Sequence, residues 1–311
     1  MKTWNNRDLI FCNCNLCGSK KNQFIYERHD KLKVVRCKNC GLVYINPRPK
    51  DGLINLLYND EYFEKDSQIG YNNYFSDSMR QSMVKASKLR LKILEDFGVN
   101  IFGKALEVGC ATGEFCSILK KAGVEATGID ISSQAIEIAQ SRYSGIPFHV
   151  ATIDVVPENM KFNFIFAFEV IEHLIDPCAF FKKASDMLKL NGFLCITTPN
   201  FECAEIVGYE NWTGFSMSLE HLYFFSKTTI EKYAEANGFE LEISLFGGGS
   251  GIKNDKISGA KRRQFIRNIL LKANLLSIAR KAKDFVKPPK HGYQPDIIRH
   301  NLFVVLRKKI N

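Results

Sequence analysis

The sequence predicts an α/β fold in which a mainly parallel sheet carries helices on both faces. Apolar strand-like segments alternate with segments of helical spacing from residue 105 onward, a pattern typical of βαβ units. The first apolar strand is followed by a glycine-rich turn, Gly109-Cys-Ala-Thr-Gly113, and then by a segment with helical spacing. A carboxylate, Asp130, ends the next strand. Ligands of such sheets bind at the carboxyl ends of the strands, so we expect the functional site there.

Length and composition are those of a globular protein. The chain has 311 residues, of which 45% are hydrophobic and 24% charged, enough for one large domain or two smaller ones. No apolar run approaches the roughly 18 residues of a membrane-spanning helix, and the N-terminal residues lack the apolar centre of a signal peptide. We therefore expect a cytoplasmic location. The ten cysteines are then metal ligands or buried thiols rather than disulfides.

The first unit, residues 1–50, is predicted to be a small zinc ribbon. It contains two CxxCG turns separated by nineteen residues, and each turn can direct two sulfur atoms to one point. Phe24–Tyr26 and Lys33–Arg36 are expected to be strands beneath the metal. Four thiolates complete a tetrahedral coordination sphere, so the Zn²⁺ is expected to be structural. The predicted ligands are Cys14, Cys17, Cys37 and Cys40.

Residues 51–97 form a second segment, a tyrosine-rich connector followed by a helix. Clustered tyrosines usually join two subdomains, and one of them can also cover a cofactor; Tyr74 is the residue we select for that role. Apolar residues recur at helical spacing from Ser78 to Phe97.

Residues 98–311 carry the alternating pattern and form the main domain. The predicted strands cover residues 105–108, 126–131, 148–150, 162–168, 193–197 and 301–306. The predicted helices cover residues 115–122, 135–143, 178–188 and 227–237.

A basic helical insertion, residues 250–295, is predicted before the last strand. Residues 258–290 contain ten Lys or Arg and one Asp, so this segment carries +9 of the net charge of +10. A basic amphipathic helix can lie on an anionic membrane surface, which would place the protein peripherally at the inner membrane surface. It can equally pack on the protein as a lid, an interpretation that we slightly favour.

The composition of the glycine-rich turn selects the class of cofactor. Asp130, 21 residues after Gly109, suits the ribose hydroxyls of an adenosine in either a dinucleotide or S-adenosylmethionine. A pyrophosphate favours GxGxxG, whereas this turn has Ala111 at the second glycine position and Glu107 just before it. A carboxylate there suits a cationic ligand. The sequence therefore favours S-adenosylmethionine.

Five segments together resemble class I S-adenosylmethionine-dependent methyltransferases. They are LEVGCATGEF, TGIDIS, FEVIEHLIDP, LKLNGFLCITTPN and EHLYFFSKTTIEKYAEANGF. With its N-terminal ribbon, the chain is similar to zinc-binding bacterial methyltransferases of sugar and cell-surface glycan pathways. The resemblance covers nearly the whole chain except about residues 250–295. It implies a Rossmann-like, seven-stranded sheet and methyltransferase activity (EC 2.1.1.-).

The resemblance also implies a set of cofactor-binding residues. Those at the methionine end are Glu107 and Gly109 with the backbone of Cys110, Ala111 and Gly113. Asp130 binds the ribose, and Ile131 lies against the adenine. Thr152 and Ile153 stand at the adenine edge, although Thr152 replaces an Asp found in many relatives. Glu169 faces the cofactor.

Two Glu-His pairs are candidates for the catalytic base. His221 is our choice, with Glu220 to orient it, because a histidine can take a proton from a hydroxyl or an acidic carbon near neutral pH. The competing interpretation of this pair is loop packing. Glu172 and His173 lie in an EVIEH segment that also resembles quinone-pathway O-methyltransferases, which implies base or metal roles, although we favour a turn-forming role.

The acceptor is expected to be a small molecule or glycan. The first hypothesis is O- or C-methylation of a sugar, nucleotide sugar or cell-surface glycan intermediate, and hence a part in polysaccharide biosynthesis. The alternative is O-methylation of a membrane quinone or polyprenyl lipid. An RNA methyltransferase is less favoured, because the ribbon lacks a concentrated basic face and no aromatic-basic interleaving occurs near the site. Nucleic acid is therefore not an expected partner, and the sequence does not indicate an oligomeric state.

Overall fold

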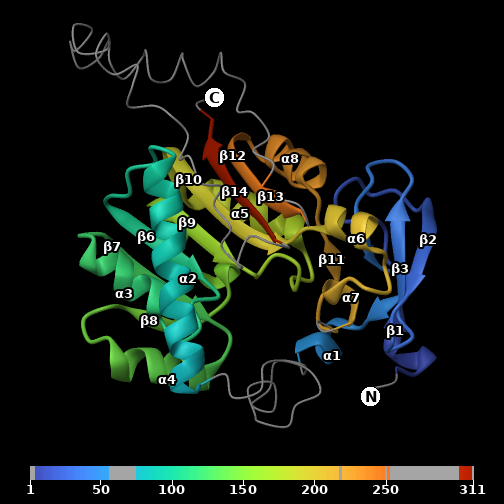
Figure 1. The fold of residues 1–311 in the computed structure, drawn as a ribbon, viewed down its shortest axis with the longest axis horizontal. Coiled ribbons are helices and arrows are strands. Elements are labelled where there is room, and N and C mark those ends of the chain that lie inside the picture. Colours follow the sequence, from blue (N-terminus) through green and yellow to red (C-terminus); the bar gives the residue numbers. More distant parts are fainter. Residues whose placement is uncertain (1–3, 56–74, 217–218, 249–250, 253–300, 310–311) are drawn as a thin grey trace, which may run out of the picture.

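A computed structural model describes residues 4–55, 75–216, 219–248, 251–252 and 301–309 (Figure 1). The tyrosine-rich segment with Tyr74 and the basic segment 258–290 lie outside these residues. In the described part of the chain, no helix has both the length and the apolar character needed to cross a membrane.

The main domain is built on a mixed sheet of eight strands in the order β13-β12-β14-β10-β9-β6-β7-β8. The strands from β8 to β10 run parallel, whereas β14 is antiparallel to both β10 and β12. β13 has only two residues; without it the sheet has seven strands, the number that the resemblance implied, and the α/β prediction is confirmed. The bounds are β6 (Lys104–Val108), β7 (Glu125–Asp130), β8 (Phe148–Val150), β9 (Phe162–Phe168), β10 (Leu188–Pro199), β12 (Phe239–Gly248), β13 (Gly251–Ile252) and β14 (Asn301–Lys308).

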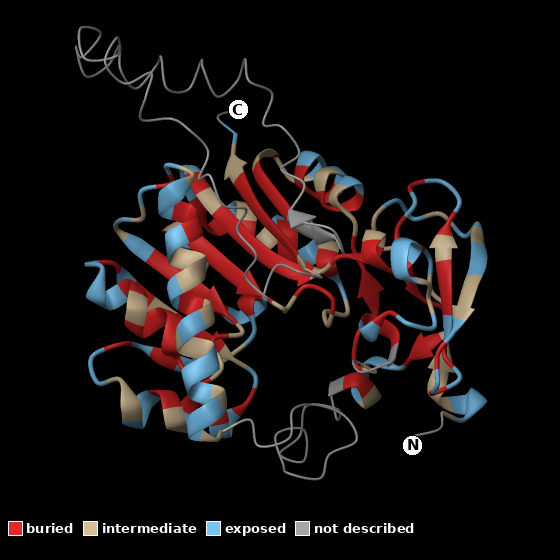
Figure 2. Ribbon diagram, viewed as in Figure 1, coloured by how far each residue is buried: buried red, intermediate tan, exposed pale blue. Residues whose placement is uncertain are grey.

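Helices cover both faces of this sheet. Along β9, Phe164 and Phe166 join one apolar cluster with residues of α2, α3 and α4, while Ile165 and Ala167 join another with residues of α5 and α8. This alternation follows from the two-residue period of a strand and buries both faces, as Figure 2 shows. The helices are α2 (Asp77–Asp96), α3 (Glu114–Lys121), α4 (Ser133–Arg142), α5 (Pro177–Met187) and α8 (Lys227–Ala236), with the 3₁₀ turn η4 (Ile153–Val155).

Strand β12 was not among the predicted strands, yet its sequence carries the signal. Phe239, Ile243 and Leu245 alternate with polar residues and are buried. On the other side, Glu240 and Glu242 form ion pairs with Arg307 of β14. The stretch between β10 and α8, for which no element was predicted, contains α6 (Phe201–Val207), α7 (Thr213–Ser216) and β11 (Tyr223–Phe224).

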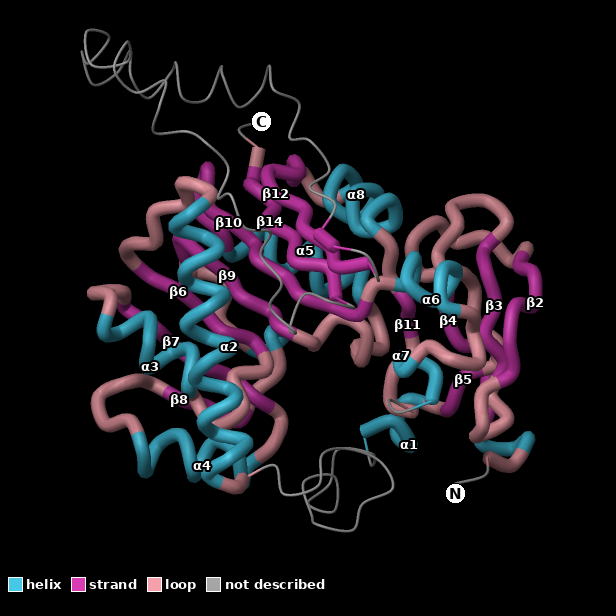
Figure 3. Tube along the Cα trace, in the orientation of Figure 1, coloured by secondary structure: helices cyan, strands magenta, loops and turns pink. Residues whose placement is uncertain are grey.

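The N-terminal unit is a small antiparallel sheet that the main domain completes. β2 (Asn22–Glu27), β3 (Lys33–Cys37) and β4 (Val43–Ile45) pair in order, and β11 pairs with β4 as the fourth strand. The short helix η1 (Asn6–Asp8) precedes β1 (Leu9–Ile10), and β1 pairs with β5 (Arg48–Pro49). The helix α1 (Asp51–Asn55) follows β5 in the chain. Figure 3 shows this second sheet beside α6 and α7. β4 of the predicted ribbon (residues 1–50) and β11 of the predicted main domain (residues 98–311) therefore belong to one sheet.

Candidate functional site

A cavity of about 830 Å³ lies where β6, β7 and β9 end. Its wall includes the turn after β6, the last residue of β7, the residues after β8, the end of β9 and one side of α2. This is the edge at which α/β sheets bind ligands. Among the predicted cofactor-binding residues, the cavity wall contains Glu107, Gly109, Cys110, Ala111, Asp130, Ile131, Thr152, Ile153 and Glu169.

The glycine-rich turn is shaped by bonds inside the protein. The amides of Gly109 and Cys110 both donate to the carbonyl of Ile129, at 2.8 and 3.0 Å. Gly109 has φ of +71°, and a Cβ there would lie 2.5 Å from a methyl of Val170. Ala111 also adopts a positive φ, of +47°. The turn is thus held in a conformation that leaves the residues after β6 facing the cavity.

Gly113 ends this turn, directly before α3. It does not contribute to the cavity wall, and a Cβ there would lie 2.6 Å from the Phe148 ring and 3.1 Å from Ala139. Its φ is +84° at the residue that precedes α3. The missing Cβ therefore permits the turn to pack against β8 and α4.

The Asp130 carboxylate is oriented by two backbone amides. Ala111 N donates to Oδ2 at 2.8 Å, and Ser132 N donates to Oδ1 at 2.9 Å. Burial raises the pKa of this carboxyl, while these hydrogen bonds oppose the rise. Each carboxylate oxygen retains further acceptor capacity, so the group can still accept bonds from a ligand's hydroxyls.

Glu107 is a buried acid that faces the cavity. The Cys116 thiol donates to its Oε2 at 3.1 Å. Burial raises the pKa of Glu107 to about 8, despite the opposing effects of Cys116 and of the Arg90 charge. Without a ligand the group is mainly neutral at pH 7, and a cation in the cavity would favour its charged form.

Glu169 directly follows β9 and has a strained backbone conformation. Its φ is +56°, and Asn301 Nδ2 donates to Oε1 at 2.9 Å. Burial raises its pKa as well. A non-glycine residue in the left-handed region costs about 1 to 3 kcal/mol and is typical of binding sites.

Arg90 lines the cavity but was not predicted as a site residue. It lies on α2, and its guanidinium carbon is 4.2 Å from the centre of the Phe168 ring. Its charge acts to lower the pKa of both Glu107 and Glu169. Helical spacing could have identified Arg90 from the sequence. Met79, Met83, Ala86 and Arg90 are three or four residues apart on α2, so they lie on the same side of the helix, and all four line the cavity.

The adenine-edge candidates lie together on the wall. Ile131 is half exposed, whereas Ile153 is buried at the start of η4. Thr152 is exposed beside it. Farther along, the wall continues with Leu174, Ile175, Ala179 and Phe180, and with Ile54 of α1. Apart from His173 and Asp176, this part of the wall is apolar.

The two predicted Glu-His pairs form one cluster, but only His173 lines the cavity. Its ring lies 4.6 Å from that of His221, centre to centre, and burial lowers its pKa to about 3. His221 and Glu220 are buried and do not contribute to the cavity wall. The structure thus places the predicted base behind the other histidine.

Glu172 completes this cluster. Its Oε1 is 4.0 Å from His173 Nε2, and Thr198 Oγ1 donates to its Oε2 at 3.0 Å. Burial, the nearby His173 and the charge of Arg28 all lower the pKa of His221. Ligand atoms of Glu172, His173 and His221 lie within 4.8 Å of one another, close enough to share a proton or a cation.

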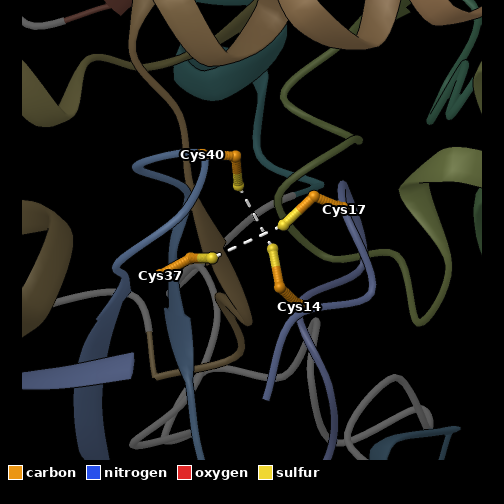
Figure 4. A group of neighbouring side chains, drawn as sticks. All are labelled: Cys14, Cys17, Cys37 and Cys40. Atoms are coloured by element: carbon orange, nitrogen blue, oxygen red, sulfur yellow. Dashed lines mark hydrogen bonds between the residues drawn. The ribbon is translucent and has the colours of Figure 1, made fainter. Parts of the chain in front are cut away.

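The four predicted metal ligands converge in the N-terminal unit (Figure 4). Cys14 Sγ is 3.3 Å from Cys40 Sγ, and Cys17 Sγ is 3.6 Å from Cys37 Sγ. All four sulfur atoms lie within 4.8 Å of one another. A tetrahedral zinc site with Zn–S bonds of about 2.3 Å requires sulfur separations of about 3.8 Å, so this group fits Zn²⁺.

Comparisons with known proteins agree with this geometry. A family model described as a methyltransferase domain matches residues 77–243. The ubiquinone biosynthesis O-methyltransferase of Bradyrhizobium diazoefficiens is 28% identical over 37% of this chain and 44% of that protein. The enzyme of the same name from Actinobacillus pleuropneumoniae serotype 7 is 32% identical over 36% of this chain and 53% of that protein. The chain thus spans about half the length of these curated relatives.

Among solved structures, the magnesium protoporphyrin IX methyltransferase of Synechocystis, with bound S-adenosylhomocysteine, shares the fold. The TM-score is 0.52 at 13% identity, and the match covers 84% of this chain and 100% of that one.

Proposed function

Since the chain belongs to the methyltransferase domain family, we propose that it transfers the methyl group of S-adenosylmethionine to a hydroxyl oxygen of a quinone-precursor-like acceptor. The observation that carries this proposal is the set of ionisable side chains in one cavity at the carboxyl ends of the strands: Glu107, Glu169, Asp130 and Arg90. The activity named for the curated relatives supports the acceptor class.

The cavity residues fit the parts of the cofactor. The buried Glu107 suits the ammonium group, and the Arg90 guanidinium suits the carboxylate of the same methionine end. Asp130, fixed by Ala111 N and Ser132 N, suits the ribose hydroxyls. Ile131 and the Thr152–Ile153 pair then remain for the adenine.

Methyl transfer needs alignment and removal of the acceptor's proton. Bound S-adenosylmethionine supplies an activated methyl carbon. His173 is the base we propose, because its imidazole reaches the cavity; burial lowers its pKa to about 3, which keeps the ring neutral but weakens it as a base. An imidazole of low pKa is a weak base, and it therefore suits a phenolic hydroxyl, whose pKa is about 10 in tyrosine, better than a sugar hydroxyl.

The wall beyond the cofactor residues supports the same acceptor class. Leu174, Ile175, Ala179, Phe180 and Ile54 are apolar and would contact an aromatic ring well. Sugar or glycan methylation, the first hypothesis from the sequence, finds no relative of that kind among the similar proteins described above. It becomes the second candidate, and quinone-type O-methylation becomes the first.

We also propose that Cys14, Cys17, Cys37 and Cys40 hold a structural Zn²⁺. Their sulfur separations support it, and a four-thiolate site leaves no position for a substrate. Burial acts to raise the pKa of Cys17, but hydrogen bonds, first from Asn39, lower it to about 7, so this thiol can ionise near neutral pH.

We also propose that residues 258–290 bind a membrane surface, and this proposal is based only on their positive charge. A quinone-type acceptor is membrane-bound, which would give the ten basic residues a partner. Co-sedimentation with anionic liposomes, weakened by salt, is the expected result. Absence of binding at low ionic strength would remove this part of the proposal.

Incubation with methyl-labelled S-adenosylmethionine and separate acceptor panels tests the main proposal. The panels are polyprenyl phenols and catechols, nucleotide sugars, and RNA. Label in the phenolic panel is the expected outcome. Label confined to nucleotide sugars would favour the second candidate, and label confined to RNA would contradict both.

A further inference from the structure

Arg28 is a fully buried cation in the N-terminal unit that reaches across to the main domain. Its Nε and Nη2 donate to the Asp30 carboxylate at 3.1 and 2.6 Å. Its Nη1 donates to the carbonyl of His221 at 2.9 Å, and Nη2 also donates to the carbonyl of Leu219 at 2.7 Å. One guanidinium therefore joins a ribbon carboxylate to two carbonyls that lie 191 and 193 residues later in the chain.

The segment that Arg28 holds is also fixed on both sides by backbone bonds. Ile45 N of β4 donates to the Leu222 carbonyl at 2.9 Å, and β11 continues this contact as a strand pair with β4. On the other side, the amides of Leu222 and Tyr223 donate to the Glu172 carbonyl at 2.9 and 3.2 Å. Residues 219–224 therefore lie between the ribbon and the turn that carries His173.

This arrangement connects the ribbon to the cavity in two steps. Arg28 fixes the carbonyl of His221, and the His221 ring contacts the ring of His173, which lines the cavity. A shift of the 219–222 backbone would move His221 against His173. Misplacement of about 1 Å near reacting groups can reduce a rate by about 100-fold.

The buried charge suggests selection for position rather than for stability. An apolar pair of similar volume is often as stable as a buried ion pair, or more stable. Only arginine, with a planar fork of several donors, can bind a carboxylate in a bidentate manner and two carbonyls at once. Lysine at this site would keep the charge opposite Asp30 but not all four contacts.

We propose that Arg28 is a positioning residue that sets the placement of His221 and, through it, of His173. Residues 1–50 thereby influence the end of the cavity that contains His173, where we expect the acceptor. None of the described residues among them lines the cavity; its first described lining residue in the chain is Ile54. The effect on catalysis rests on the proposed function; the effect on the histidine rings does not.

The test compares Arg28→Lys with Arg48→Lys in the full chain. Arg48 makes a matched control, because it is also buried in the N-terminal unit and pairs with Asp51 at 2.6 Å, while within the described part of the chain it makes no hydrogen bond to residues 219–222. For Arg28→Lys we expect kcat to fall at least tenfold while the Kd for S-adenosylmethionine stays within twofold. Arg48→Lys should leave both within twofold. Equal kcat in the two variants, or a parallel loss of cofactor affinity in Arg28→Lys, would overturn the proposal.

Histidine NMR provides a readout that does not need an acceptor. With ¹⁵N-labelled histidine, the imidazole signals of His173 and His221, assigned from His173→Gln and His221→Gln, should shift in Arg28→Lys and stay in place in Arg48→Lys. Unchanged signals in both variants would refute the positioning role even if no methyl acceptor were found. If Arg28→Lys does not fold, the paired change Arg28→Met with Asp30→Leu removes both buried charges. The same signals are then expected to shift, and unchanged signals would again refute the role.

Discussion

The pKa of Glu107 yields a quantitative prediction for cofactor binding. In the protein without ligand, burial raises this pKa to about 8, and the proposed ammonium partner favours the ionised form. Glu107 must then lose its proton when S-adenosylmethionine binds. Affinity should therefore rise with pH below 8, and protons should be released on binding.

The magnitude follows from the size of the pKa difference. At pH 7 about nine-tenths of the free protein would carry a protonated Glu107, which lowers the apparent affinity about tenfold, or about 1.4 kcal/mol, relative to the ionised form. Between pH 6 and 7 the affinity should rise close to tenfold. This window avoids the cofactor's own α-amino group, which titrates at about 7.7 to 8.0.

Calorimetry in buffers of different ionisation enthalpy measures both quantities. The wild-type protein should release nearly one proton per site at pH 6.5, and Glu107→Gln should remove most of this release and flatten the pH dependence. Asp130→Asn is the matched control, since it should weaken binding and keep the pH slope. If Glu107→Gln kept the wild-type slope, the assignment of Glu107 to the ammonium group would be refuted.

Three further predictions concern the cysteines, the glycine-rich turn and the proposed base. Cys17→Ser should reduce bound zinc below the one equivalent per chain expected for the wild type, measured by elemental analysis, and should lower the melting temperature; full zinc content would contradict the four-thiolate site. Gly113→Ala should lower the free energy of unfolding by about 1 to 3 kcal/mol, because a Cβ would be strained at positive φ and would meet Phe148; a neutral result in urea denaturation would show that the turn relaxes. His173→Gln should lower kcat about 100- to 10,000-fold with little change in cofactor Kd, and an unaffected kcat would exclude His173 as the base.

Much of the fold was predictable because its elements are locally encoded. The predicted helix over residues 227–237 corresponds to α8, and the predicted strand over residues 162–168 has the observed bounds of β9. These segments have clear apolar periods and defined caps, such as Ser226 at the start of α8. The α/β class follows from their alternation.

The elements that were missed depend on distant partners. β11 has two residues, and it is a strand because β4, almost 180 residues earlier, provides its hydrogen bonds. No helix or strand is predicted for residues 219–225, so neither their pairing with β4 nor their contact with Arg28 could be derived from the local sequence pattern. β12 differs, because its alternation was visible and was overlooked.

In the candidate site, too, some features could be predicted from the sequence and others depend on tertiary packing. Glu107 and Asp130 end adjacent strands, so the sequence predicts that they meet at one edge, and both lie on the cavity wall. The order of the histidines depends on tertiary packing, which places His173 at the cavity and His221 behind it. Arg90 could have been found from its position on the cavity-facing stripe of α2.

Product analysis with a ¹³C-methyl cofactor is the most direct test of O-methyl transfer from S-adenosylmethionine. After incubation with a polyprenyl catechol, we expect one new ¹³C signal from a methyl carbon bonded to oxygen, produced in stoichiometric amount with S-adenosylhomocysteine. A methyl carbon bonded to carbon, or protein that does not bind the cofactor, would contradict it.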